Sequence, residues 1–147
     1  MFAYVCLGTN DPKRSQVFYD RILACLGLMR CQTPDEEFGD WAGWGHYARY
    51  GADQLALWLC PPFDGASAAP GNGVMVALKA ASLAEVDSFH RVALEFGGTC
   101  EGAPGWRPHY NADFYAAYVR DPDGNKLAVV CRGQCPEAAV GGEPLGV

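Results

Sequence analysis

The chain has 147 residues, of which half are hydrophobic and 19% are charged. This length suits one buried hydrophobic core, so we expect a single compact domain. The formal net charge of −6 argues against nucleic acids and anionic membrane surfaces as partners, because both select basic proteins.

Neither a membrane-spanning segment nor a secretory leader is expected. No run of about 18 apolar residues occurs, and the chain begins with the strand-like residues 2–7 instead of a basic region followed by a hydrophobic block. We therefore expect a soluble protein of the cytoplasm. Its seven cysteines have no CxxC spacing, so we expect most of them to be reduced.

The first half of the chain predicts a strand, a helix and three shorter strands. Residues 2–9 alternate as a strand does, and the Asn-Asp-Pro segment at 10–12 is a typical helix start. Apolar residues then recur at helical spacing to about Leu26, and Gly27 ends the helix. Strand-like runs follow at 28–32, 42–50 and 54–60.

The same pattern restarts after a connection at 61–72, which is rich in proline, glycine, alanine and serine. Residues 73–79 predict a strand, and Ser82 caps a helix that runs to about Phe96. Proline and glycine are too frequent at 103–111 for regular structure. Two further strands, 113–120 and 125–132, are joined by a proline-led turn at 121–124.

A shift of 71 residues aligns the chain with itself, which indicates a duplication. The identities fall at strand, helix and helix-ending positions: Val5 with Val76, Leu7 with Leu78, Phe18 with Phe89, Leu23 with Leu94, Gly27 with Gly98, Tyr47 with Tyr118, Arg49 with Arg120, and Cys60 with Cys131. We interpret residues 1–132 as one domain of two strand-helix-three-strand modules. Module one spans 1–60, the linker 61–72 and module two 73–132, and an irregular tail follows at 133–147.

Two phrases accompany the duplication: GTNDPKRSQVFYD after the first strand and RDPDGNKL before the last one. With this order and spacing, residues 1 to about 132 resemble the vicinal oxygen chelate superfamily, which includes glyoxalases, bleomycin-resistance proteins and extradiol dioxygenases. The resemblance implies an α+β fold in which tandem βαβββ modules form a curled mixed-sheet cup with helices outside. It also implies a ligand on the concave face.

In this superfamily, four strand positions hold a divalent metal through histidine, glutamine or glutamate. The resemblance places these positions at Tyr4, Met75, Leu57 and Ala128. Alanine and leucine have no ligand atom, a thioether suits soft copper(I), and a phenol is mostly protonated, so we expect no metal cofactor at this site.

An alternative is that one strand has been placed a residue out of register, which would turn every side chain to the other face. The neighbouring residues Cys6, Leu127 and Val129 offer no better set of metal ligands.

The loop before the seventh strand holds the candidate polar site residues. The resemblance places this loop over the mouth of the cup, with Trp106, Arg107, His109 and Tyr110 able to close on a ligand. His109 could act as a general base or hydrogen-bond donor, although the sequence shows no orienting partner for it. Alternatively, these aromatic residues only cover the sheet edge.

The expected cup lining is mostly apolar with a few phenol hydroxyls. Its residues are Tyr4, Cys6, Tyr47, Leu57, Met75, Phe114, Tyr118 and Ala128. Such a lining suits a flat, partly aromatic organic molecule. It also suits a cup filled by its own side chains. For Cys6, core packing is favoured over a nucleophilic role, because no basic neighbour would lower its pKa.

The leading hypothesis is a metal-independent protein that binds a small molecule, comparable to the antibiotic-sequestering members of the superfamily, and pairs as a homodimer. The alternative is a metal-dependent glyoxalase-like lyase or isomerase, or a dioxygenase, with a displaced metal or a site centred on His109. A third reading is an interaction module whose cup is filled.

Overall fold

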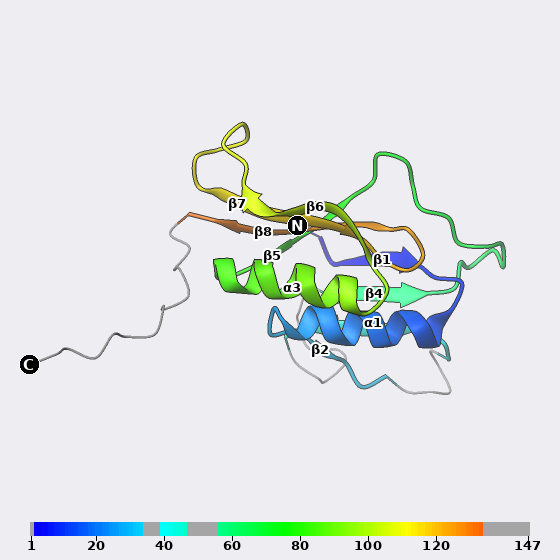
Figure 1. Cartoon of the computed structure of the whole chain (residues 1–147). Coiled ribbons are helices and arrows are strands. Elements are labelled where there is room, and N and C mark those ends of the chain that lie inside the picture. The colour runs from blue at the N-terminus through cyan, green and yellow to red at the C-terminus, as the bar shows by residue number, and fades with distance from the viewer. Residues whose placement is uncertain (1, 34–38, 47–55, 134–147) are drawn as a thin grey trace, which may run out of the picture.

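The computed structural model describes residues 2–33, 39–46 and 56–133 (Figure 1). Module one contains β1 (Tyr4–Gly8), α1 (Pro12–Ala24), β2 (Met29–Arg30), β3 (Ala42–Gly45) and β4 (Ala56–Cys60). Module two contains β5 (Val76–Lys79), α3 (Leu83–Glu95), β6 (Thr99–Trp106), β7 (Phe114–Arg120) and β8 (Lys126–Arg132). This order confirms the tandem βαβββ pattern, while the expected tail beyond residue 133 lies outside the described residues.

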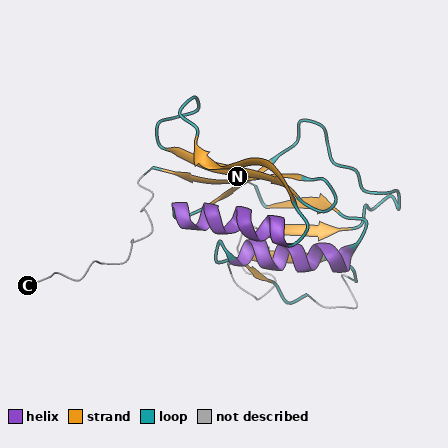
Figure 2. Ribbon diagram, viewed as in Figure 1, coloured by secondary structure: helices purple, strands orange, loops and turns teal. Residues whose placement is uncertain are grey.

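Each module forms a four-stranded mixed sheet (Figure 2). The strand orders are β1-β4-β3-β2 and β5-β8-β7-β6. In each sheet the first strand of the module pairs in parallel with its last strand, and the remaining pairs are antiparallel. The predicted α+β class with mixed sheets is therefore confirmed. In the described part of the chain, no helix is long and apolar enough to cross a membrane.

β6 corrects one prediction, because residues 103–106 belong to a strand although proline and glycine are frequent there. The strand accommodates them through irregularities in its pairing with β7, between Cys100 and Gly102 and again between Gly102 and Gly105. A bulged strand tolerates glycine and proline where a regular ladder does not. The local composition therefore predicted a loop where tertiary pairing makes a strand.

The two helices begin 71 residues apart, as the self-alignment predicts. Asp11 caps α1 by accepting a hydrogen bond from the backbone N–H of Arg14, and Ser82 caps α3 in the same way for Glu85. The helix ends are also 71 residues apart, but the glycines in the turns that follow them are only 70 residues apart. The turn after α1 contains Gly27 with φ 69°, whereas its counterpart after α3 is Gly97 with φ 101°.

The last strands of the two modules show the same one-residue difference, because β4 and β8 are related by a shift of 70 residues instead of 71. Leu57 on β4 pairs with Val5, and the equivalent partner of Val76 is Leu127 on β8. The position equivalent to Ala128 is therefore Trp58, not Leu57. The prediction that Leu57 lies on the same face as Tyr4 is wrong, because side chains alternate between the two faces of a strand.

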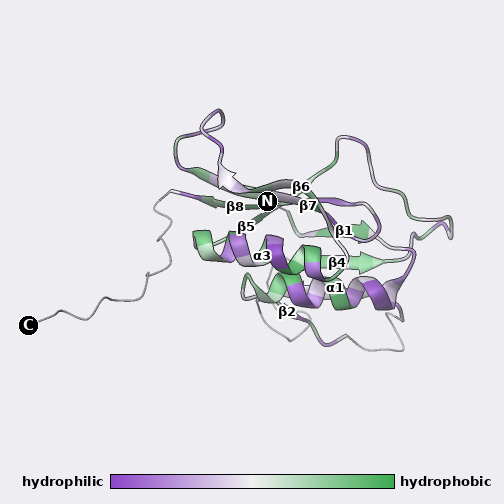
Figure 3. Cartoon of the chain, in the orientation of Figure 1, coloured by the Kyte–Doolittle hydropathy of each residue, from purple (hydrophilic) through white to green (hydrophobic). Residues whose placement is uncertain are grey.

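The core lies between the layer of helices and the two sheets (Figure 1). Both helices alternate hydrophobic and hydrophilic residues along their length (Figure 3), and they place their apolar sides on this core. Phe18 and Phe89, which the self-alignment pairs, are both fully buried in it. Leu57 also belongs to this core, with 6% of its surface exposed. The side of each sheet that faces away from the helices is called its open face below.

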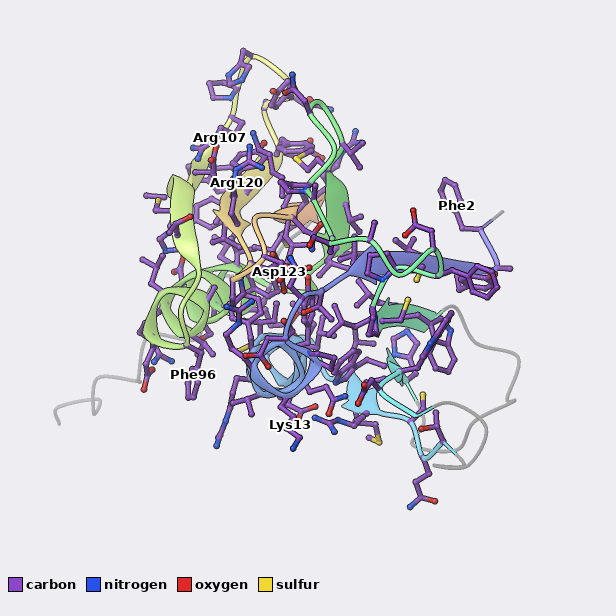
Figure 4. All side chains as sticks on the ribbon, turned by 90° about the vertical axis from the view of Figure 1, so that its right-hand side faces the viewer. Phe2, Lys13, Phe96, Arg107, Arg120 and Asp123 are labelled. Carbon is purple, nitrogen blue, oxygen red and sulfur yellow. The ribbon has the colours of Figure 1, made fainter. Side chains whose placement is uncertain are left out.

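The two family phrases meet in space where the modules join. The carboxylate of Asp123, in the β7–β8 turn, is 3% exposed and lies against the start of α1 (Figure 4). Its Oδ2 accepts hydrogen bonds from the hydroxyls of Thr9 and Ser15, both at 2.7 Å. Its Oδ1 accepts from the backbone N–H of Asn10 at 2.9 Å and from Arg14 Nη2 at 3.0 Å.

A second carboxylate of the same turn completes this junction. Asp121 accepts a hydrogen bond from the buried hydroxyl of Tyr19 on α1 at 2.6 Å. It also accepts from the backbone N–H groups of Asp123 and Asn125, which fixes the turn. Asn125 in turn donates to the carbonyl of Gly8 at the end of β1. The turn of module two is therefore bonded to the strand, the helix start and the helix body of module one.

Replacement of Asp123 by Asn tests this junction. Burial opposes ionisation of Asp123, but the hydrogen bonds from Asn10, Thr9 and Ser15 and the charge of Arg14 outweigh it and hold the pKa of the carboxyl below its ordinary value. We expect the variant to lose about 2–3 kcal/mol of unfolding free energy in denaturant titrations near neutral pH. Asp64→Asn, which alters an exposed turn carboxylate, should change it by less than about 0.5 kcal/mol.

The same variant has a defined pH dependence. Because the folded-state pKa of Asp123 is depressed, its stabilisation is complete above the unfolded-state pKa of about 3.9 and is lost as the pH falls through the folded-state pKa. The difference in stability between the native chain and Asp123→Asn should therefore narrow below about pH 4. A difference that stayed constant down to pH 2 would contradict the role assigned to the ionised carboxylate.

Candidate ligand-binding site

The open face of module one is exposed and largely apolar. Tyr4 and Cys6 alternate with the core residues Val5 and Leu7, so they point to the open face, where Tyr4 is 61% exposed. Trp58 pairs with Cys6 and lies on the same face. The structure therefore places Tyr4 and Cys6 on an open face, as expected, with Trp58 in the position that the sequence assigned to Leu57.

Two thiols are in contact on this face. Cys6 Sγ lies 3.4 Å from Cys60 Sγ, although the sequence analysis favoured core packing for Cys6. Cys6 is exposed and Cys60 is buried, and both are free thiols. Burial, the hydrogen bond with Cys6 and the proximity of that thiol raise the pKa of Cys60 to about 12. Cys131, the self-alignment partner of Cys60, instead lies in the core and is disulfide-bonded, whereas Cys6, Cys25, Cys60 and Cys100 are free thiols, as expected for most of the cysteines.

The thiol pair predicts unequal reactivity. At about pH 8, iodoacetamide should alkylate Cys6 well before Cys60 in the folded protein, because the thiolate is the nucleophile and Cys60 is both buried and protonated. Peptide mapping by mass spectrometry measures the two rates, and unfolded protein is the control in which they should converge. Equal rates in the folded protein would contradict the placement of Cys60.

Module two carries a pocket of about 530 Å³ at its open face. Its lining comes from the residues before β5, from β6, β7 and β8, and from the loop that joins β6 to β7. The lining residues are Asn72, Gly73, Val74, Met75, Glu101, Arg107, His109, Tyr110, Tyr118, Arg120 and Lys126. Five of the predicted site residues thus lie together: Met75, Arg107, His109, Tyr110 and Tyr118.

Other predicted residues lie away from this pocket. Trp106 packs edge-on against Tyr115, whose hydroxyl donates to Asp87 on α3, so both residues lie on the helix side of the sheet. Phe114 contacts the ring of Tyr110 at a centroid distance of 5.3 Å but does not line the pocket. Ala128 is 1% exposed and does not line it either, and Tyr47 lies outside the described residues.

Tyr118 forms the floor between two cationic side chains. The Arg107 guanidinium carbon lies 5.6 Å from the centre of the Tyr118 ring, and Lys126 Nζ lies 6.0 Å from it. Two glycines on β6 make room for the Tyr118 ring and the Arg107 guanidinium. A Cβ at Gly102 would lie 2.9 Å from Tyr118 Cδ2, and one at Gly105 would lie 2.9 Å from Arg107 Nη1. The two glycines therefore leave the space that the ring and the guanidinium occupy.

The sequence analysis missed the charged residues of the pocket. Arg120 donates to Glu101 Oε1 at 2.7 Å, and Lys126 Nζ lies 3.7 Å from Glu101 Oε2. The hydrogen bond and charge of Arg120, together with Lys126, hold the pKa of Glu101 below its ordinary value. Alternation along β7 from Tyr118 places Arg120 on the same face, and this signal could have identified it.

His109 stacks on Tyr110 with ring centroids 4.2 Å apart. Within the described part of the chain, its ring nitrogens have no hydrogen-bond partner, and no carboxylate orients it. A general base in an acid-base pair is usually oriented by a second group. The geometry therefore supports a ligand-contacting role for His109 more directly than a catalytic one.

The family's metal positions do not fit a divalent cation. On the open faces they hold a phenol at Tyr4, a thioether at Met75, an indole at Trp58 and a methyl group at Ala128, whereas divalent ions such as zinc require imidazole, thiolate or carboxylate ligands. No group of three or more histidine, cysteine or acidic side chains with the geometry of a metal site occurs among residues 2–33, 39–46 and 56–133. These four positions therefore do not form a site for a divalent metal ion.

Comparison with known proteins agrees with this fold. The chain is similar to a glyoxalase/bleomycin resistance protein from Albidiferax ferrireducens T118, at 33% identity and a TM-score of 0.74, over 90% of this chain and 99% of that one. It shares its fold with a glyoxalase-related enzyme from Fulvimarina pelagi, at 22% identity and a TM-score of 0.64, over 97% and 95% of the two chains.

The same fold occurs in a lactoylglutathione lyase from Agrobacterium tumefaciens, at 19% identity and a TM-score of 0.57, over 89% of this chain and 92% of that one. In sequence comparison, the chain matches no protein-family profile and no curated protein. The similarity to the Albidiferax protein spans nearly the whole of both chains, and the fold and the two motifs agree with it. The chain belongs to the glyoxalase/bleomycin resistance/dioxygenase family, that is, to the vicinal oxygen chelate superfamily.

Proposed function

We propose that this protein binds a small, partly aromatic organic molecule in the module-two pocket without a metal at the family's ligand positions. The observation that carries the proposal is the pocket itself. Its volume of about 530 Å³ falls in the range of small-molecule sites, and its walls combine Met75, Tyr110 and Tyr118 with a few polar groups. A pocket of this kind holds a flat ligand by burial against rings and orients it by charge and hydrogen bonds.

The open faces of the two sheets also support a homodimer. Large apolar side chains are exposed on or beside the open faces: Phe2 69%, Tyr4 61%, Val74 60%, Met75 45% and Tyr110 65%. Apolar surface of this kind is usually covered in a soluble oligomer, most often by a second copy related by two-fold symmetry. Pairing of the open faces would also enclose the pocket, which increases the area that a ligand can bury.

Oligomeric state gives a direct test. Light scattering during size-exclusion chromatography should give twice the chain mass of 15.8 kDa. Tyr4→Glu, which places a charge on the exposed apolar face, should shift the protein toward the monomer. Lys13→Glu, a charge change on the exposed side of α1, should not. A monomer in the native protein at micromolar concentration would contradict the dimer.

Ligand and metal content test the binding function. Elemental analysis of protein purified without chelator should find well under one equivalent of nickel, zinc, iron or manganese per chain. A panel of aromatic metabolites and antibiotics should contain compounds that raise the melting temperature, as expected for ligands that bind only the folded state. Tyr118→Leu should abolish the shift, whereas the exposed helix variant Val17→Ala should retain it.

The alternative, a metal-dependent lyase, isomerase or dioxygenase, predicts the opposite result. Nearly one tightly held metal ion per chain would favour it and would contradict the proposal. An empty protein whose melting temperature no compound changes would favour an interaction module instead.

A further inference from the structure

The module-two pocket is basic although the whole chain is acidic. Three basic side chains line it, those of Arg107, Arg120 and Lys126, against one carboxylate, that of Glu101. Glu101 is shared by Arg120 and Lys126, so the lining keeps an excess of two positive charges. The chain as a whole has a formal charge of −6. A local field opposite in sign to the net charge selects the charge of a ligand, because the rest of the surface repels that ligand.

Arg107 is the cation without a counter-charge. Its guanidinium donates to two backbone carbonyls, Ala103 O at 2.6 Å and Trp106 O at 3.3 Å, and forms no ion pair with any residue of the described chain. By contrast, Arg30 makes a two-pronged pair with Asp20, and Arg14 pairs with Asp123. Carbonyls orient a guanidinium but do not neutralise it, and a guanidinium has five donors. Arg107 therefore remains able to bind an anion with its unused donors.

The backbone holds Arg107 in this position. The two carbonyls lie on β6, the same strand whose Gly105 leaves room for the guanidinium, with a hypothetical Cβ only 2.9 Å from Nη1. The backbone N–H of Arg107 donates to Phe114 O at 2.8 Å, which ties the residue to β7. Figure 4 shows Arg107 and Arg120 near each other at one end of the molecule, with Lys13 at the opposite end.

We propose that the ligand is an aromatic carboxylate. Its carboxylate pairs with the Arg107 guanidinium, with Lys126 as the second cation, and its ring lies against Tyr118 and Met75. Arginine and carboxylate have matching planar geometries, and the resulting charge-assisted hydrogen bonds are about twice as strong as neutral ones. This inference rests on the proposed small-molecule function and adds the charge of the ligand and the residue that recognises it.

Matched pairs of probe compounds test whether the pocket prefers a negatively charged ligand. Calorimetry compares 2-naphthoate with 2-naphthamide, and indole-3-acetate with indole-3-acetamide, because each pair differs in charge but hardly in shape. For the native protein, at least one carboxylate should bind about 10-fold more tightly than its amide. The preference should shrink between about 0.05 M and 0.5 M salt, since screening weakens exposed ion pairs.

Variants assign the preference to Arg107. Arg107→Gln should reduce carboxylate binding to the level of the amide while amide binding changes little. Arg107→Lys should keep part of the preference, because it retains the charge but not the two-pronged geometry. Lys13→Gln, which removes a distant cation, should leave the preference unchanged. Gly105→Ala provides a second route, since its Cβ should displace the guanidinium without removing it, and the melting temperature should stay near that of the native protein.

The outcomes separate this inference from the proposed function. Equal binding of acid and amide by the native protein would overturn the inference and leave small-molecule binding supported. A preference that survives Arg107→Gln would overturn the role of Arg107. Failure of every probe to bind would count against both proposals.

Discussion

The buried carboxylate of Asp123 is the interaction on which the arrangement of the two modules depends. Four donors from the β1–α1 junction converge on it, and neighbouring Asp121 binds the hydroxyl of Tyr19 in the interior of α1. A buried charge is tolerated only when its hydrogen bonds are made, so the turn of module two can lie in one place relative to module one. This turn connects β7 to β8, and both strands line the pocket. The junction therefore also fixes the position of these strands relative to module one.

A second constraint follows from the length of the turn after each helix. Both helices have 13 residues, but the glycine that follows α3 comes one residue earlier than the glycine that follows α1, and β8 is displaced by one position relative to β4 in the repeat. In a strand, one position exchanges the core for the open face. Leu57 consequently packs in the core, Trp58 takes its place on the open face, and Cys60 meets Cys6 instead of joining the core as Cys131 does.

The pocket combines features that β6 and β7 bring together. Glycines at 102 and 105 leave space for the Tyr118 ring and the Arg107 guanidinium, and irregular pairing lets the strand carry them. The result is an aromatic floor flanked by cations on an acidic protein, beside strand positions whose side chains do not suit a divalent metal. These properties support recognition by stacking and charge in preference to metal chelation.

The sequence by itself determined the duplication, the mixed α+β class and the starts of both helices, because hydrophobic periodicity and capping residues are local signals. It also indicated Met75, Arg107, His109, Tyr110 and Tyr118, which the pocket brings together. Only the tertiary structure decided that 103–106 is a strand, that Leu57 faces the core and that Glu101, Arg120 and Lys126 share the pocket. Alternation along β7 places Arg120 on the face of Tyr118, but strand register and the ion pairs of Glu101 depend on residues distant in the chain, so local patterns do not specify them.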